Sequence, residues 1–518
     1  MRQRVFALAL VLALAAGCTR RPAPDLVPAL PAEPRPGLGA LRVDLAACFA
    51  PARFANAVWG VSVRSLATGE VLFERNPRTL LMPASNMKVI TAAVAAERLG
   101  WTHTFETRLV AAGPIEQGTL MGDLIVEGTG DPSFAGRPGE RTSVVDAWAE
   151  QLLAAGLTTV EGRIVGDDNA LGDEGLGQGW AWDYLAYGYA TPAGGLAFNE
   201  NVVLLTLRPG PRPGDPAVLV LTPDVGGIAV DHRVTTGDND SRVSLNLRRM
   251  PGSGILRVTG SIPANRQEVR QTVSVDNPTL FLAEALRRAL VSRGVDVAGG
   301  AADIDTLPAP PRPADAGHPA SPVSARAGST VLLTHVSPPL ADIIKVMLKV
   351  SQNMYADTLL RVIGTTADGD RLPAGTADAG QAVVEDTLNT WGIEPRRYVL
   401  ADGSGLSRYN YLSTDVLVDV LTRMYADERH RQAFLEALPI AGVDGTIAGR
   451  MKGTRAEGNA RAKTGSIAHA RALSGFVTTA EGEPVVFSMM VNNFNVPQSE
   501  ADAVIDRAVA RLANFRRH

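Results

Sequence analysis

The sequence predicts an α/β protein of the α+β kind, with an antiparallel sheet flanked by helices and a long, mostly β middle region. Near the C-terminus, residues 461–467, 471–479 and 485–491 follow one another as three strand patterns with short turns, which is typical of an antiparallel sheet. The middle of the chain, residues 105–327, has short strand patterns rich in Gly and Pro. With 518 residues the chain is too long for one ordinary core, so we expect several domains.

Two strands and a helix are expected near the start of the fold. Residues 58–63 and 70–74 are the strand patterns, and a turn joins them. Residues 85–99 follow with apolar positions at helical spacing, and Gly100 ends the pattern. We therefore expect Ser85 in the first turn of a helix.

The middle region has weaker patterns. Helical spacing predicts two helices, at residues 143–155 and 279–293. Short runs bounded by turn residues predict strands at 160–165, 202–207, 217–221, 242–247 and 255–259. A Pro-rich stretch at residues 307–327 closes the region.

Helical patterns return after this stretch. Residues 339–363 predict one helical segment that contains Ser351 and Asn353, and residues 499–515 predict a closing helix. We expect a signal peptide at 1–17 and a Pro- and Ala-rich tether at 18–40, followed by the folded part of the chain.

The N-terminus has the pattern of an export signal. Arg2 and Arg4 precede an apolar run at residues 5–16, which is too short to span a bilayer. The sequence Ala15-Ala16-Gly17-Cys18 resembles a bacterial lipoprotein box, in which cleavage leaves a lipidated Cys18 as the first residue. We expect an exported protein of the periplasm or cell envelope, anchored by lipid at Cys18. The alternative is an ordinary secretory signal cut nearby.

Composition excludes several partners. The net charge of −4 and the absence of a basic tract argue against nucleic acid. The seven histidines show no metal-ligand spacing, so we expect neither a metal site nor a cofactor. Cys48 lies in an apolar run and is expected to be a core residue.

Three short motifs carry the candidate chemistry: Ser85-Asn86-Met87-Lys88, Ser351-Gln352-Asn353 and Lys463-Thr464-Gly465. Five of the 50 Lys and Arg residues are lysines, and two of these five lie in the motifs. Arginine cannot release its proton in a protein and lysine can, so these lysines are candidates for proton transfer.

Each motif residue has an expected role. Ser85 and Lys88 lie about one helical turn apart, so the amine can take the proton of a nucleophilic hydroxyl, provided that burial or a nearby charge lowers its pKa. Lys463 is expected to supply that charge. Ser351 would pass a proton to the leaving amine, and Asn353 would hold the substrate amide and steady Lys88.

The third motif falls on a predicted strand. Gly465 would let a substrate backbone lie alongside, as in strand addition. The hydroxyls of Thr464 and Ser466, with the charge of Lys463, would bind a terminal carboxylate. The N–H groups of Ser85 and Ser466 would form an oxyanion hole.

The ordered trio resembles the set of motifs found in penicillin-binding proteins and serine β-lactamases. Over residues 41–515 the chain is similar to the class C low-molecular-mass penicillin-binding proteins, the D-alanyl-D-alanine carboxypeptidase/endopeptidase family. Further family-like stretches are 82–91, 130–132, 179–183, 351–357, 402–408 and 442–446. The resemblance implies a transpeptidase-type catalytic domain, split between 41–104 and 329–518 around two inserted, mostly β domains within 105–328. It also implies peptidoglycan peptides as substrates and β-lactams as covalent inhibitors.

Two positions depart from the family pattern. Gln352 replaces the more usual Asp or Asn, and Asp183 stands alone where relatives often have two acids after the tryptophan. In the family an acid in this area is thought to meet the amino end of the diaminopimelate side chain, which makes Asp183 a candidate for that role.

Two other functions remain open. One is a β-lactamase or esterase on the same scaffold, which would differ in how fast the acyl-enzyme is hydrolysed. The other is a non-catalytic cell-wall-binding lipoprotein, which would have no reason to keep the three motifs together.

Overall fold

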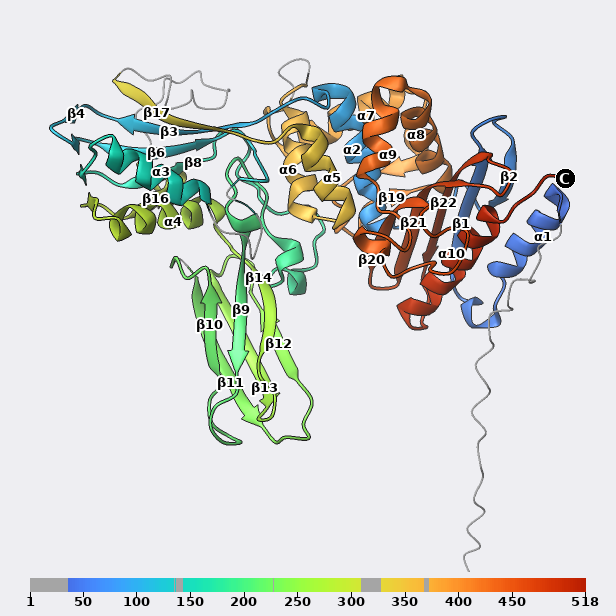
Figure 1. Ribbon diagram of the computed structural model, residues 1–518, viewed down its shortest axis with the longest axis horizontal. Helices are drawn as coiled ribbons and strands as arrows, with labels where there is room; N and C mark the ends of the chain where they lie inside the picture. Colours follow the sequence, from blue (N-terminus) through green and yellow to red (C-terminus); the bar gives the residue numbers. More distant parts are fainter. Residues whose placement is uncertain (1–35, 135, 137–142, 227, 309–327, 368–371) are drawn as a thin grey trace, which may run out of the picture.

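The computed structural model describes residues 36–134, 136, 143–226, 228–308, 328–367 and 372–518 (Figure 1). The expected signal peptide, the lipidation site Cys18 and most of the expected tether lie outside the described residues.

A five-stranded antiparallel sheet forms the centre of the part drawn at the right of Figure 1. It contains the three predicted C-terminal strands and also the two strands predicted near the start of the fold. In spatial order the strands are β2 (Val71–Arg75), β1 (Val58–Ser65), β22 (Pro484–Asn492), β21 (Ala470–Thr478) and β20 (Arg461–Ile467). Strand β20 therefore lies at an edge of this sheet.

Helices cover both faces of this sheet. One face packs against α1 (Leu38–Cys48) and α10 (Gln498–Ala513), and the core on that side includes Cys48. Burial raises the pKa of Cys48 to about 11, so this thiol is an unreactive core residue, as predicted. The other face is covered by α2 (Met87–Leu99), α5 (Leu340–Lys349), α6 (Asn353–Gly364), α7 (Ala377–Thr390), α8 (Thr414–Ala426) and α9 (Glu428–Ala437).

Helix α2 lies in the middle of this helical layer. Every residue from 87 to 96 is buried, and small side chains such as Ala92 and Ala95 allow its neighbours to approach on all sides. Ser85 precedes α2, in the 3-10 turn η2 (Ala84–Asn86), rather than lying inside the predicted helix. Because α2 cannot tilt without disturbing the core, its N-terminal end, where Ser85 and Lys88 lie, is held in place.

The predicted helix at residues 339–363 is two helices, α5 and α6. Between them Ser351 has a φ of 64°, a left-handed conformation that costs a non-glycine residue about 1–3 kcal/mol. Ser351 therefore lies at a sharp break in the chain and Asn353 begins the next helix.

The middle of the chain is mostly β, as predicted, and is drawn at the left of Figure 1. A five-stranded sheet has the order β16 (Ala301–Asp303), β8 (Ile164–Asp167), β6 (Asp123–Gly128), β3 (Glu106–Ala112) and β17 (Ser329–Val336). A smaller sheet contains β15 (Asp296–Val297), β7 (Thr159–Val160), β5 (Thr119–Leu120) and β4 (Ile115–Glu116). Helices α3 (Ser143–Ala154) and α4 (Pro278–Ser292) pack against each other beside these sheets.

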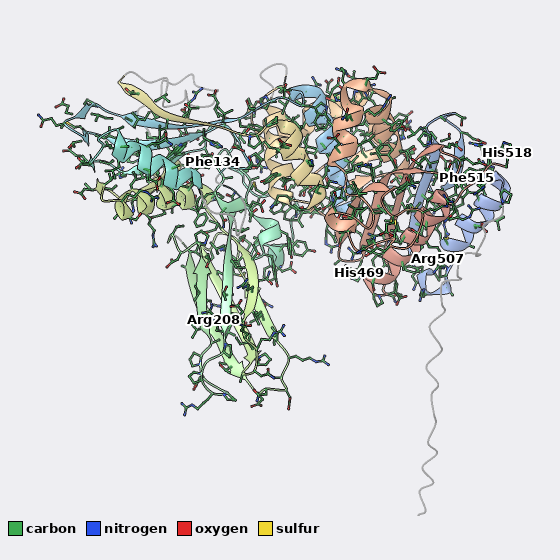
Figure 2. The ribbon with its side chains drawn as sticks, in the orientation of Figure 1. Phe134, Arg208, His469, Arg507, Phe515 and His518 are labelled. Atoms are coloured by element: carbon green, nitrogen blue, oxygen red, sulfur yellow. The ribbon has the colours of Figure 1, made fainter. Side chains whose placement is uncertain are left out.

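A lobe of two three-stranded sheets projects from this region (Figure 1). Arg208, labelled in Figure 2, lies at the end of its strand β9. The first sheet contains β10 (Val218–Thr222), β9 (Val202–Arg208) and β14 (Val269–Ser274), and the second contains β11 (Ala229–Gly237), β13 (Ile255–Pro263) and β12 (Ser244–Arg248).

The prediction of a single strand at residues 160–165 is wrong. The chain forms β7 and β8 in different sheets, and Gly162 makes the turn between them. A Cβ at Gly162 would lie 2.4 Å from the main-chain oxygen of Gly122, so only glycine fits this crossing.

The two ends of the middle region lie side by side. Strand β3 pairs with β17, and next to this pair the N–H of Ser337 donates to the carbonyl of Phe105 at 2.9 Å. The Ser337 hydroxyl accepts in turn from the N–H of Phe105 at 2.9 Å. The chain therefore leaves the helical layer and returns to it at one place.

Candidate active site

The three sequence motifs meet at one end of α2. Ser85 and Lys88 come from η2 and the first turn of α2, Ser351 and Asn353 from the α5–α6 junction, and Lys463 from the edge strand β20. Contacts between their side chains, described below, bring all five predicted catalytic residues together.

Lys88 is fully buried and has three polar neighbours. Its Nζ lies 3.1 Å from Ser85 Oγ, 2.6 Å from Asn353 Oδ1 and 2.6 Å from the main-chain oxygen of Ser404. The amide and main-chain oxygens can only accept, so they take two N–H groups of Lys88 in either protonation state. In the neutral amine the lone pair is then left to accept the hydroxyl proton of Ser85.

Burial favours the neutral form of the Lys88 amine. It lowers the pKa of Lys88 from its ordinary value to about 8, although the nearby carboxylates of Asp357 and Asp402 favour the charged form. A base with a pKa near 8 has a useful neutral fraction at neutral pH and still binds a proton well.

Lys463 is also fully buried. Its Nζ donates to Ser351 Oγ and to the main-chain oxygen of Thr464, both at 2.8 Å. Burial and the charge of Lys88 lower the pKa of Lys463 well below its ordinary value. The sequence led us to expect that the charge of Lys463 would lower the pKa of Lys88, but burial is the leading cause at Lys88.

Asn353 is oriented by the middle region of the chain. Its Nδ2 donates to the main-chain oxygen of Tyr189 at 2.7 Å, which turns Oδ1 toward Lys88. Tyr189 lies in the short helix η4 (Gly188–Ala190). The neighbouring Gln352 donates from Nε2 to Glu200 Oε2 at 2.7 Å, and its Oε1 caps α6 by accepting from the N–H of Met354.

Three residues without an expected role also act on Lys88: Asp357, Asp402 and Ser404. Asp357 Oδ1 accepts from the N–H groups of Gly403 and Ser404 at 2.8 and 3.2 Å, so it holds the turn whose carbonyl binds Lys88. Burial and, next, the charge of Asp402 raise the pKa of Asp357 to about 7. The sequence does hold a signal for Asp357: it comes four residues after Asn353, so both side chains lie on the same face of one helix.

The third motif lies where β20 meets η2. A Cβ at Gly465 would lie 2.4 Å from the main-chain oxygen of Pro83, so only glycine allows β20 to pack this closely against the start of η2. From the sequence we expected a different reason for this glycine, namely space for a substrate backbone. Thr464 Oγ1 lies 2.8 Å from Thr446 Oγ1, and Ser466 is exposed on the edge strand.

Asp183 is exposed in η3 (Trp182–Tyr184). The ring of Tyr184 lies 5.7 Å from that of Tyr189, whose carbonyl holds Asn353. Burial, followed by the charges of Tyr184, Tyr187 and Asp183, raises the pKa of Tyr189 to about 12. Asp183 thus lies near Tyr189, the residue that orients Asn353.

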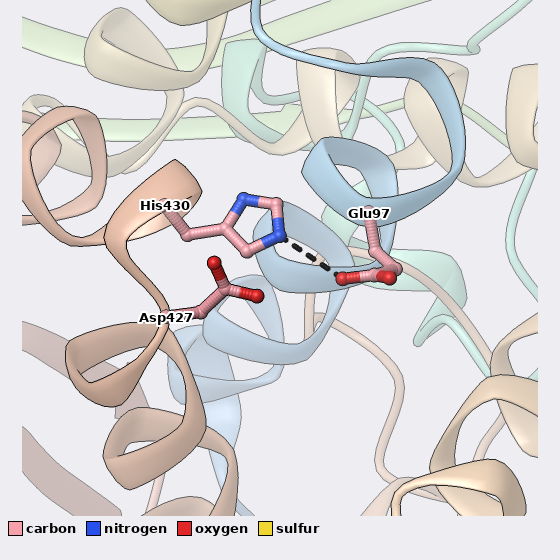
Figure 3. A group of neighbouring side chains, drawn as sticks. All are labelled: Glu97, Asp427 and His430. Carbon is pink, nitrogen blue, oxygen red and sulfur yellow. Dashed lines mark hydrogen bonds and ion pairs between the residues drawn. The ribbon is translucent and has the colours of Figure 1, made fainter.

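One group of metal-ligand type lies in the helical layer. Glu97, Asp427 and His430 face one another there (Figure 3). The Nε1–H of Trp101 donates to His430 Nδ1 at 3.0 Å, which leaves the proton on Nε2 for Glu97 Oε2, also at 3.0 Å. Both ring nitrogens of His430 are therefore in use, and the group is structural.

The chain has an antiparallel sheet with helices on both faces, and the three motifs meet at one end of the central helix α2. These two features define the class of penicillin-binding proteins and serine β-lactamases.

Comparison with known proteins gives the family. Residues 41–515 match the model of the D-Ala-D-Ala carboxypeptidase 3 (S13) family, and the chain belongs to this family. A D-alanyl-D-alanine carboxypeptidase of Actinomadura sp. (strain R39) is 35% identical over 92% of this chain and 85% of the relative. D-alanyl-D-alanine carboxypeptidase DacB of Haemophilus influenzae is 29% identical over 85% of this chain and 87% of the relative.

Solved structures agree. The crystal structure of penicillin binding protein 4 from Haemophilus influenzae has a TM-score of 0.77 with this chain at 26% identity, covering 92% of this chain and 99% of that one. A complex of the same protein with a β-lactam gives a TM-score of 0.71 at 25% identity, with the same coverage. The predicted family and fold class are confirmed, and so is the prediction that the chain is an enzyme.

Proposed function

We propose that the chain is a serine D-Ala-D-Ala carboxypeptidase and endopeptidase that acts on peptidoglycan stem peptides through an acyl-enzyme on Ser85. The observation that carries this proposal is the arrangement around Lys88. Two fixed acceptors occupy its N–H groups and leave its third position to the hydroxyl of Ser85.

The reaction follows from this geometry. Ser85 Oγ attacks the carbonyl carbon of the penultimate D-alanine while its proton moves to Lys88 Nζ. The C–N bond then breaks, and the leaving amine takes a proton from Ser351 Oγ, which contacts Lys463 Nζ at 2.8 Å. In this proposal the proton taken up by Lys88 replaces the one that Ser351 gives. Water hydrolyses the Ser85 ester, which releases the shortened peptide and restores the hydroxyl.

Lys463, Thr464 and Ser466 bind the terminal carboxylate in this proposal. Because the pKa of Lys463 is well below its ordinary value, the arriving carboxylate stabilises the protonated amine and draws a proton into the site. The N–H groups of Ser85 and Ser466 form the oxyanion hole, and the edge position of β20 supports pairing with an extended peptide.

The test uses fluorescent penicillin and a D-Ala-D-Ala peptide. Ser85→Ala should abolish both covalent labelling and D-alanine release while the thermal midpoint stays nearly unchanged. Ser499→Ala, at an exposed serine of α10, is the matched control and should retain both activities. Mass mapping of the labelled peptide identifies the nucleophile, and label on any serine other than Ser85 would contradict the proposal.

We propose Asp183 as the group that binds the free amine of the diaminopimelate side chain. Two facts support this: its carboxylate is exposed beside Tyr189, and Trp182 and Tyr189 are 47% and 45% exposed, so apolar surface lies next to the acid. Asp183→Asn should raise KM for a peptide with a free side-chain amine and leave KM unchanged for the N-acetylated peptide. An equal change for both peptides would remove Asp183 from this role.

Two alternatives remain distinguishable. A β-lactamase or esterase would turn over the penicillin adduct rapidly, whereas the proposed carboxypeptidase keeps it long enough to isolate. A non-catalytic cell-wall-binding lipoprotein would release no D-alanine, and membership of a carboxypeptidase family argues against it.

We propose further that the protein is exported to the periplasm or cell envelope and anchored by lipid at Cys18. Support comes from the sequence Ala15-Ala16-Gly17-Cys18, which follows an apolar run. Among the described residues, no helix is both long enough and apolar enough to cross a bilayer.

A further inference from the structure

A cavity of about 730 Å³ lies in the middle region, and none of the predicted catalytic residues lines it. Its walls come from the turn between β12 and β13, the start of α4, the end of β16 and the loop after β8. The volume is within the range of small-molecule sites. Its polar lining is unusual because it combines one buried arginine with several acids.

Arg249 forms the cationic wall. Its side chain is 5% exposed, and Nη1 donates to Ser274 Oγ at 2.8 Å. Nε and Nη2 are buried and have no hydrogen-bond partner, and Asp276 Oδ1 is 4.0 Å from Nη2. Burying guanidinium donors without partners is costly, and Arg249 lines the cavity, so an anionic group bound there would supply the missing acceptors. Nε and Nη2 together form the fork that binds a carboxylate through both oxygens.

Asp168, Asp303 and Asp305 form the anionic wall. One oxygen of each lies within 4.8 Å of the others. Thr279 Oγ1 donates to Asp168 Oδ2 at 2.7 Å, whereas Asp168 Oδ1 is buried without a partner. Burial, reinforced by the neighbouring acids, raises the pKa of Asp168 to about 7 and that of Asp305 to about 6. A cationic group between these carboxylates would relieve their repulsion.

We propose that this cavity is a second binding site for a small zwitterionic amino acid or peptide, whose carboxylate pairs with Arg249 and whose ammonium lies among Asp168, Asp303 and Asp305. A bound metal ion would neutralise the carboxylates and leave the Arg249 donors unpaired. An inorganic anion would pair with Arg249 and leave the carboxylates to repel one another. A ligand with both charges satisfies both walls. The choice of D-alanine and D-alanyl-D-alanine as the ligands rests on the proposed function, because that reaction releases D-alanine.

The experiment measures binding while the active site is blocked. The protein is first acylated with penicillin at Ser85, and D-alanine and D-alanyl-D-alanine are then titrated by calorimetry. We expect saturable binding of at least one of them. The N-acetylated dipeptide, without the ammonium, and the dipeptide amide, without the carboxylate, should bind about tenfold more weakly or worse.

Variants assign the binding to the cavity. Arg249→Gln changes the cationic part of the lining and Asp303→Asn the anionic part, and each should weaken binding about tenfold while penicillin still labels the protein. Arg257→Gln is the matched control, because Arg257 is 60% exposed and paired with Asp231, and it should bind as the unmodified chain does. Thermal midpoints show that each variant is folded.

The outcomes separate the two proposals. Failure of penicillin to label Ser85 contradicts the proposed function, and the titration is then made on the unlabelled protein. Absence of saturable binding of both ligands overturns the cavity proposal. Binding that neither Arg249→Gln nor Asp303→Asn changes would overturn it as well.

Discussion

Lys88 and Lys463 are both fully buried, yet their neighbours differ in kind. Lys88 has two acceptors that cannot donate, together with the hydroxyl of Ser85. Lys463 has the hydroxyl of Ser351 and a carbonyl. The first arrangement directs a lone pair at the nucleophile, and the second holds a group that can gain a proton when an anion arrives.

Replacing each lysine by arginine separates these roles. Lys88→Arg keeps a positive charge but removes the base, so acylation should fall by at least the roughly 10²- to 10⁴-fold that a positioned base contributes. Lys463→Arg should slow acylation less, because a permanent cation still attracts the carboxylate. The measurement is the acylation rate with a β-lactam and with a D-Ala-D-Ala peptide. Equal losses in the two variants would mean that Lys88 acts only as a charge.

The pH dependence of acylation should report the pKa of Lys88. The base works when neutral, so the rate should rise with pH, reach half its maximum near pH 8 and level off about one pH unit higher. Asp357 stabilises the charged form of Lys88, so Asp357→Asn should move the midpoint to lower pH. The rate is measured from about pH 5 to 10, the interval over which Lys88 changes protonation. A midpoint that moves upward, or does not move, would contradict this assignment.

The site residues were predicted in two ways. Ser85 and Lys88 are three residues apart, so local geometry alone brings them together, whereas Ser351, Asn353 and Lys463 were predicted from the resemblance of the ordered motifs to a known family. Two of the groups that orient the site are main-chain oxygens, those of Ser404 and Tyr189. A carbonyl has the same chemistry in every residue, so no side-chain pattern predicts it.

At the scale of elements, the junction between α5 and α6 depends on contacts made by other parts of the chain. Residues 350–352 contain no glycine or proline, so the helical pattern continues through them and predicts one helix. The break is stabilised by the contact of Lys463 with Ser351 and by Glu200, which accepts from Gln352. Tertiary contacts of this kind leave no local signal, whereas the strands of the central sheet were predicted from their own residues.

Gln352→Glu tests how much this junction matters. The change keeps an oxygen that caps α6 but places a carboxylate against Glu200, so we expect a lower thermal midpoint and slower acylation. Adding Glu200→Gln restores a donor opposite an acceptor and should recover most of the loss. The double-mutant cycle is measured by thermal unfolding and by penicillin acylation. Losses that simply add in the double variant would show that the two side chains are not coupled.

At the scale of the whole molecule, we propose that the insertion spans residues 106–336 rather than ending at 328. Strand β17 belongs to the sheet of β3, and the chain rejoins the helical layer only after it. The catalytic domain would then consist of residues 41–105 and 337–518.

The lipid anchor has its own test. Cys18→Ser should move the protein from the membrane fraction to the soluble fraction of the envelope, because the acyl chains would no longer be attached. Penicillin labelling should persist, since Cys18 lies outside the part of the chain that forms the site. The check is fractionation together with the intact mass of the native protein. A mature N-terminus beyond residue 18 with no lipid would refute the anchor.

The contact between Phe105 and Ser337 marks the place where the chain is shortened most simply. Joining these two residues directly would remove residues 106–336 and leave every strand of the central sheet in place. The same deletion would remove the carbonyl of Tyr189, the acceptor that orients Asn353. The ends of the middle region are thus separable from the central sheet, whereas its interior contributes to the order of the catalytic residues.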